Sequence, residues 1–214
     1  MFYPQQVNAK ELKQSYDRGH RDFCRIDLQS IDLSESSLSG IAFVQAQLND
    51  TNLSLVDLEG ANLTGAVFSK AMLWRANLRQ SQLVGSRGDR SNLIRADLSQ
   101  ANCCRIDLHR ADLRLANLQL TDLREANLAG ANLSYTNLMG ANLTGANLSY
   151  ANLTGANLTG ANLTQTQLER AIAVNVSWGS NRLRDLNSNQ LQWQDTERTL
   201  SLCQAMSLSK QQVK

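Results

Sequence analysis

Residues 131–163 read ANLSYTNLMGANLTGANLSYANLTGANLTGANL, and this stretch decides the fold. A small residue, a polar residue and a leucine recur every five positions, followed by two residues that are mostly small or polar. The register holds from position 23 to position 168, which gives thirty repeats, and leucine fills twenty-five of their centres. The other centres are Phe23, Phe43, Phe68, Gly88 and Cys103. So regular a tandem repeat predicts a solenoid, in which each unit packs only on its neighbours.

A period of five suits neither a helix nor a straight strand. In a helix, five residues rotate the leucine by about 140°, so the leucines form no stripe. In a strand, side chains alternate with a period of two, so successive leucines would change faces. Within one repeat, an extended Ala-Asn-Leu segment points its alanine and leucine one way and its asparagine the other. The chain must therefore turn a corner every five residues and close into a coil.

The repeats resemble the pentapeptide-repeat family, whose unit is written A-(D/N)-L-x-x. The segments 61–63, 96–98 and 156–158 carry this match, which covers roughly residues 21–170. The resemblance implies an all-β solenoid, a right-handed quadrilateral β-helix with four repeats per coil and about 7.5 coils in total.

Twenty residues per coil would place residues 20 apart in one column. Positions 28, 48 and 68 would then face inward together. Gly88 would lie between Phe68 and Leu108, where its missing side chain leaves room for the larger ring of Phe68. The alternative is that Gly88 marks a small local bulge, as glycines in strands often do.

The first twenty residues are expected to cover the open end of the solenoid. Asn8 with Glu11 three residues later fits a helix N-cap with a capping box, so we expect a short helix over residues 9–18. Leu12 and Tyr16, four residues apart, would lie against the first coil. An open end would expose apolar core and unpaired backbone, which is why a cover is needed.

Three parts follow from this pattern: a leader with a capping helix (1–20), the β-helix (21–170) and a C-terminal cap or tail (171–214). The leader, followed by DFCRIDL, resembles the start of cyanobacterial members of the family, including one that acts in heterocyst differentiation. In the tail, the sequence favours a helix over residues 196–208. The tail could cover the last coil, mediate a dimer or stay disordered, so the protein is expected to be a monomer or a dimer.

Composition excludes several classes of protein. The chain has 21 basic and 19 acidic residues, no run of 18 apolar residues and no apolar segment of a secretory signal in its first 20 residues. We therefore expect a cytoplasmic protein that spans no membrane. The cysteines have no C-x-x-C motif or metal-ligand spacing, which favours reduced thiols and no metal; they are Cys24, Cys103, Cys104 and Cys203.

The sequence offers no set of catalytic residues. Its two histidines are His20, at the entry to the first coil, and His109, which follows an inward leucine and so points outward. A core filled by leucine leaves no pocket for a substrate. The sequence also lacks the Lys-Ser/Thr that a phosphate-binding glycine loop needs. We therefore expect no enzyme and no cofactor.

Charge is distributed unevenly along the rod. Residues 21–69 hold 2 basic and 7 acidic residues, whereas residues 70–114 hold 9 basic and 4 acidic. The resemblance implies that some relatives inhibit or protect type II topoisomerases by imitating DNA. Such a mimic needs a rod that is acidic throughout, whereas residues 70–114 form a basic middle section here, the basic waist. Direct binding of nucleic acid through that waist is a further alternative, disfavoured by the small overall charge.

The most consistent interpretation is a protein-binding scaffold or regulatory adaptor in cyanobacterial signalling or differentiation. Folding the sequence on four sides gathers arginines with exposed apolar residues beside the inward Leu73, Leu93 and Leu113, and interface hot spots favour aromatic and arginine residues. The alternative is that single exposed apolar groups are normal on a protein surface. The partner is expected to be a protein with an acidic and apolar surface. The candidate site consists of Lys70, Met72, Trp74, Arg75, Arg90, Ile94, Arg95, Arg110, Arg114 and Leu115.

Overall fold

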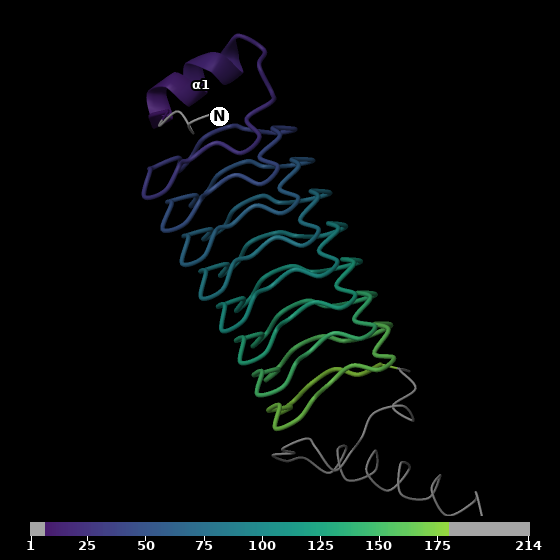
Figure 1. Ribbon diagram of the computed structural model, residues 1–214. Coiled ribbons are helices and arrows are strands. Elements are labelled where there is room, and N and C mark those ends of the chain that lie inside the picture. The colour runs from purple at the N-terminus through teal and green to yellow at the C-terminus, as the bar shows by residue number, and fades with distance from the viewer. Residues whose placement is uncertain (1–6, 180–214) are drawn as a thin grey trace, which may run out of the picture.

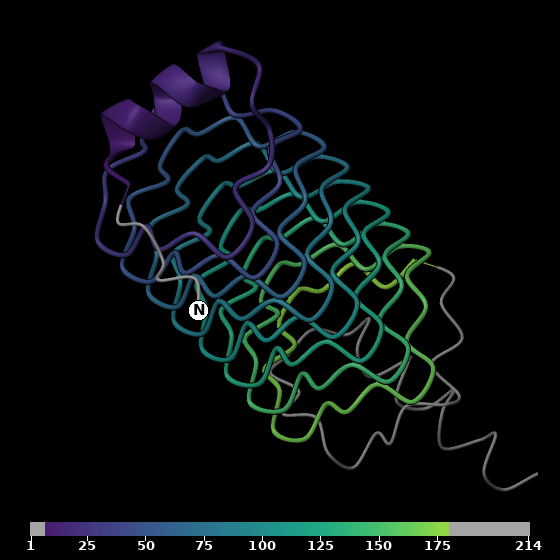
Figure 2. The same ribbon diagram turned by 45° about the horizontal axis from the view of Figure 1, so that its top comes forward.

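The computed structural model describes residues 7–179 as a rod of stacked coils with one helix across its end (Figure 1). The helix, α1, spans Ala9–Asp17, and the rest winds as a right-handed, four-sided β-helix (Figure 2). The expected fold class is thereby confirmed. Within the described range, no helix is long and apolar enough to cross a membrane. The expected tail helix over residues 196–208 and Cys203 lie outside the described residues.

Successive coils are joined by a ladder of single-residue parallel bridges, each between residues 20 apart. The ladder runs from the Asp22–Ala42 bridge to the Asn157–Ser177 bridge, one bridge for each five-residue side. The Leu28 N–H donates to the carbonyl of Gln47 (2.8 Å), and the Gln47 N–H donates to the carbonyl of Ile26 (2.8 Å). Since these bridges continue through Ser177, the β-helix extends beyond the expected boundary at residue 170.

The corners of the coil are β-turns with a left-handed residue, except for a bend at residues 174–175. The Ile31 N–H donates to the Leu28 carbonyl (3.4 Å), and Ser30, the third residue of that turn, has φ of 59°. The same conformation recurs at every fifth residue from position 25 to position 175. Most of these residues are not glycine; Arg75 has φ of 54°, for example. The polar second position of the repeat supports the turn, because the Asp27 carboxylate accepts the N–H of Gln29 (3.2 Å).

The interior is filled by the small and the central residue of each repeat. Leu28, Leu48 and Phe68 face inward in one column and are almost fully buried, as the register predicts. Each buried leucine contributes about 1.5–3 kcal/mol through apolar surface removed from water. Where serine or threonine replaces the alanine of the repeat, its hydroxyl donates a hydrogen bond to a backbone carbonyl. For example, the Thr51 hydroxyl donates to the Leu28 carbonyl (2.7 Å). The core is therefore a set of leucine ladders with its polar groups satisfied.

The N-terminal end is closed as the sequence predicts. Asn8 Oδ1 accepts the Glu11 N–H (3.0 Å), and Glu11 Oε2 accepts the Asn8 N–H (3.2 Å), which completes the capping box. Leu12 is fully buried, and the Tyr16 hydroxyl donates to the carbonyl of Ser39 (2.8 Å). The helix α1 therefore covers the first coil: Leu12, Ala9 and Tyr16 pack against the core, and the Tyr16 hydroxyl adds a polar contact.

Candidate protein-binding face

The predicted site residues lie on three successive coils of one side of the rod. The bridges of Asn92 to Met72 and to Asp112 stack these coils. We define the basic face as the outward residues of this side together with the corner before it and the corner after it. The first corner carries Lys70, Arg90 and Arg110; the second carries Arg75, Arg95 and Leu115.

Apolar side chains occupy the centre of the basic face. Met72 is 49% exposed, and Trp74 and Ile94 are half-buried. The Arg75 guanidinium lies over the Trp74 ring, 4.9 Å from its centroid, so one face of the indole is already covered. Leu115, at the corner of the next coil, is also 49% exposed. The structure thus places the predicted apolar residues on three successive coils, and we call this group the apolar strip. It crosses the face obliquely, from Met72 in the middle of its side through Ile94 to Leu115 at the second corner.

The cations of the basic face differ in whether they are paired. The Arg114 guanidinium binds the Asp112 carboxylate (2.8 Å), and this contact raises the pKa of Arg114. The cations at the two corners make no salt bridge within residues 7–179; they are Lys70, Arg75, Arg90, Arg95 and Arg110. Two rows of unpaired positive charge therefore border the apolar strip, while Arg114 is neutralised by its neighbour. The sequence analysis counted Arg114 as an equal member of the site and missed this pairing.

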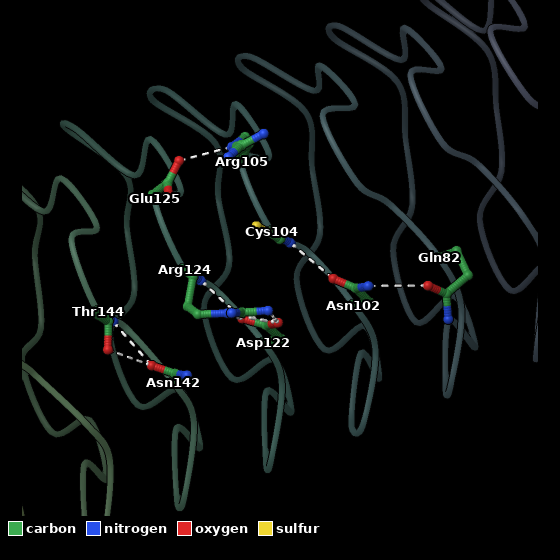
Figure 3. Close-up of polar contacts among 9 residues, drawn as sticks. All are labelled: Gln82, Asn102, Cys104, Arg105, Asp122, Arg124, Glu125, Asn142 and Thr144. Carbon is green, nitrogen blue, oxygen red and sulfur yellow. Dashed lines mark hydrogen bonds and ion pairs between the residues drawn. The ribbon is translucent and has the colours of Figure 1, made fainter.

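The opposite side of the rod has arginines of a different kind (Figure 3). Arg105 binds Glu125 (2.7 Å), and Arg124 binds Asp122 (2.7 Å). Hydrogen bonds from these arginines lower the pKa of Glu125 and of Asp122 below their usual values. Positive charge on that side is thus balanced locally, which gives the basic face a natural control.

A second group of exposed apolar residues lies further along the rod and was missed. Tyr135 follows Leu115 in the same corner column and is 63% exposed, while Leu120, at the next corner, is 56% exposed. Met139 is also exposed, and its carbonyl accepts the Leu120 N–H (3.0 Å). The signal was available in the sequence, because residues 20 apart share a column.

Other reactive side chains do not assemble into a site. The backbone N–H of His109 is bound by Asp107 (3.1 Å), and His20 lies exposed beyond α1. In the part of the chain that the structure describes, no three His, Cys, Asp or Glu residues could together hold a metal ion. Cys24, Cys103 and Cys104 are free thiols, and complete burial raises the pKa of Cys103.

The repeats match those of known proteins. Eight copies of a model of pentapeptide repeats match the chain, over residues 26–65, 61–87, 91–128, 121–160 and 136–172. HetL, a pentapeptide repeat protein involved in heterocyst differentiation regulation from the cyanobacterium Nostoc sp. strain PCC 7120, is 33% identical. That match covers 83% of this chain and 95% of HetL, with a TM-score of 0.39.

Two further solved structures are similar in sequence to a lower degree. Full-length QnrB1, a plasmid-mediated fluoroquinolone resistance protein, is 15% identical over 86% of this chain and 99% of its own, with a TM-score of 0.41. A pentapeptide repeat protein from the thylakoid lumen of Arabidopsis thaliana is 28% identical. It covers 59% of this chain and 77% of its own, with a TM-score of 0.28. No curated protein matches the sequence.

Proposed function

The chain belongs to the pentapeptide repeat family, and on that premise we propose that it is a non-enzymatic, protein-binding scaffold or regulatory adaptor. The observation that carries this proposal is the basic face, where the apolar strip lies beside unpaired cations at both corners. Exposed apolar groups among arginines are costly to leave in water and are favoured at the centres of protein interfaces. The similarity to HetL supports a regulatory role, in cyanobacterial signalling or differentiation.

The partner in this proposal is a protein with an acidic surface and an apolar pocket. Opposite charges steer two proteins together, so the rate of association should fall as the salt concentration rises. Met72 and Trp74 would enter the apolar pocket, since they are apolar neighbours on one coil of the strip and Met72 is half exposed. The corner cations would meet carboxylates at the rim of the interface.

The distribution of charge also favours this proposal over the alternative that the rod imitates DNA. A rod that takes the place of a duplex must be acidic along the surface that enters the partner's groove. Residues 21–69 hold 7 acidic and 2 basic residues and are net negative, whereas the adjoining residues 70–114 hold 4 acidic and 9 basic residues and are net positive. A groove that attracts the first part would repel the second.

The test is capture of native partners by the full-length protein, with cross-linking, from a cyanobacterial lysate. The double variant Trp74→Ala, Arg95→Glu should lose these partners while keeping the β-rich circular dichroism spectrum of the parent. The matched control is Arg105→Ala, Arg124→Ala, which removes arginines from the opposite side and should retain them. If the first variant captures the same partners with the parent's affinity, the basic face is not the binding site.

A further inference from the structure

We propose that the partner contributes an acidic amphipathic α-helix that lies along the axis of the rod, over the basic face. This inference rests on the proposed function and specifies the element that the basic face receives. It follows from four features of the face: its width, its axial spacing, its backbone and its two rows of charge.

The width of the basic face fits a single helix. Its unpaired cations are confined to the two corners, with Lys70 and Arg90 on one side and Arg75 and Arg95 on the other. Three extended residues separate the corners, which is about 10 Å. A helix with its side chains is about 10–12 Å across, so one helix fills the face and brings its two flanks over the corners.

The axial spacing of the face also suits a helix. Successive coils are stacked at the strand spacing of about 4.8 Å, and a helix advances about 5.4 Å per turn. Over the three coils that hold Met72, Ile94 and Leu115, the mismatch stays below about 2 Å, which flexible side chains absorb. Because Met72, Ile94 and Leu115 lie progressively closer to the second corner, a helix that fills the face would contact one of them at each coil.

The backbone of the face excludes an added strand as the occupant. The Met72 N–H donates to the Thr51 carbonyl (3.0 Å), and the Met72 carbonyl accepts the Leu53 N–H (2.7 Å). At the corner, the Arg75 N–H donates to the Ile94 carbonyl (3.0 Å). These groups are used up in the ladder, whereas strand addition needs a free sheet edge. The occupant must therefore bind through side chains, as a helix does.

The composition of the strip favours a protein helix over nucleic acid. Single-stranded nucleic acid stacks its bases on open aromatic faces. Trp74 is the aromatic residue of the basic face, and Arg75 already covers one side of its ring. The other apolar residues, Met72, Ile94 and Leu115, have no aromatic ring and suit leucine-like side chains better than bases.

The two rows of charge define the sequence that the helix should have. With unpaired cations on both sides of the strip, the complementary helix carries carboxylates on both flanks of its apolar stripe. The Asp112–Arg114 ion pair closes the strip at one end and offers no free charge there. The helix should therefore carry its flanking carboxylates over two or three turns, opposite the corner cations of the basic face.

The experiment uses the full-length protein and a fluorescent synthetic peptide of about 20 residues, a length that permits stable helix. The peptide has leucines at i, i+3, i+4 and i+7, with glutamates on both flanks, and binding is followed by fluorescence anisotropy. One control peptide has the same composition with the stripe scrambled, and a second has glutamates on one flank only. A DNA duplex and a single strand of equal charge are titrated in parallel.

We expect the striped peptide to bind and the scrambled peptide to bind about tenfold or more weakly. The affinity of the peptide with glutamates on one flank only should lie between those of the other two peptides. Two double variants, one at each corner, should each weaken binding of the striped peptide by about tenfold. The first combines Lys70→Glu with Arg90→Glu, and the second combines Arg75→Glu with Arg95→Glu. The control Arg105→Ala, Arg124→Ala should leave its affinity unchanged.

Two outcomes would overturn the inference. One is equal affinity for the striped and scrambled peptides, and the other is tighter binding of either DNA than of the striped peptide. Suppose that the two peptides bind equally and that the Trp74→Ala, Arg95→Glu variant still loses the native partners. A helix would then be ruled out as the occupant, while the proposed function would remain supported. Unchanged native capture in that variant removes the proposed function itself.

Discussion

The ring of Phe68 occupies the volume that a side chain at Gly88 would fill. A Cβ atom placed on Gly88 would lie 2.0 Å from Cε2 of Phe68 and 2.6 Å from Cζ. Both residues are buried in the same inward column, one coil apart. The glycine is therefore the complement of an oversized neighbour, which confirms the packing interpretation of this interruption and removes the alternative of a local bulge.

Substitution of Gly88 should destabilise the β-helix. In Gly88→Leu the new side chain has no space beside Phe68, and overpacking of this kind costs about 1–3 kcal/mol. The double variant Phe68→Leu, Gly88→Leu restores the usual leucine ladder and should recover most of that loss. Denaturant unfolding of the parent, both single variants and the double variant measures the coupling. A Gly88→Leu protein as stable as the parent would contradict this packing relationship.

The corners allow a second test of contacts between coils. Gly155 and Gly60 both have left-handed φ, of 68° and 64°, so alanine is strained at either position by about 1–2 kcal/mol. A Cβ atom on Gly155 would also lie 2.5 Å from the ring of Tyr135, whereas one on Gly60 has no described atom within 4 Å beyond its chain neighbours. Because Tyr135 must leave its rotamer, Gly155→Ala should cost about 0.5–1.5 kcal/mol more than Gly60→Ala.

The contribution of Tyr135 can be isolated by removing its ring. In a Tyr135→Ala background, the two glycine substitutions should lower the melting temperature equally. A difference that persists without the ring would show that the extra cost comes from the backbone at Gly155 instead.

The ion pair between Asp122 and Arg124 makes part of the stability depend on pH. A hydrogen bond from Arg124 lowers the pKa of Asp122 below its ordinary value of 3.8 in the folded protein. The pair therefore stabilises the fold above about pH 4, and this contribution is lost as the pH falls through the lowered pKa. Asp122→Asn should flatten the loss of stability below pH 4.

Asp122→Asn is a conservative change that keeps the support of the following turn. The Asp122 Oδ1 atom accepts the Arg124 N–H (3.1 Å), and an asparagine oxygen can replace it in that bond. Chemical denaturation between about pH 2 and pH 7 measures the effect. An unchanged pH profile in the variant would show that the ion pair contributes nothing to stability.

The sequence specified the backbone far better than the surface chemistry. Period and register determine which residues face inward, so the burial of Leu28 and the match of Phe68 to Gly88 could be predicted. Pairing of surface charges depends on rotamers: Arg114 binds Asp112 two residues away, whereas Arg105 binds Glu125 one coil away. Each arginine has an acidic residue at only one of these spacings, since the residues 20 away from Arg114 are Ile94 and Ser134 and the residue two before Arg105 is the buried Cys103. These pairs could therefore have been predicted by applying both spacings to each arginine.

The polar columns on the outside give the last prediction, for Asn117→Asp. The Asn117 amide donates to the Asp97 carboxylate (3.1 Å), and the Asn117 Oδ1 atom accepts the amide of Asn137 (3.1 Å). An aspartate at position 117 would replace the first hydrogen bond by repulsion between two carboxylates. This should destabilise the protein by about 1–3 kcal/mol at neutral pH.

The pH dependence identifies the cause of that loss. Like charges raise the pKa of the carboxylates in the folded state, so the penalty should shrink as the pH falls and one of them is protonated. The matched control is Asn147→Asp, whose column neighbours, Asn127 and Gln167, are uncharged. Thermal unfolding at neutral and acidic pH should show a deficit that acid relieves in Asn117→Asp and a smaller, less pH-sensitive one in Asn147→Asp. Equal deficits at both pH values in the two variants would mean that the asparagine columns act through turn geometry and not through charge.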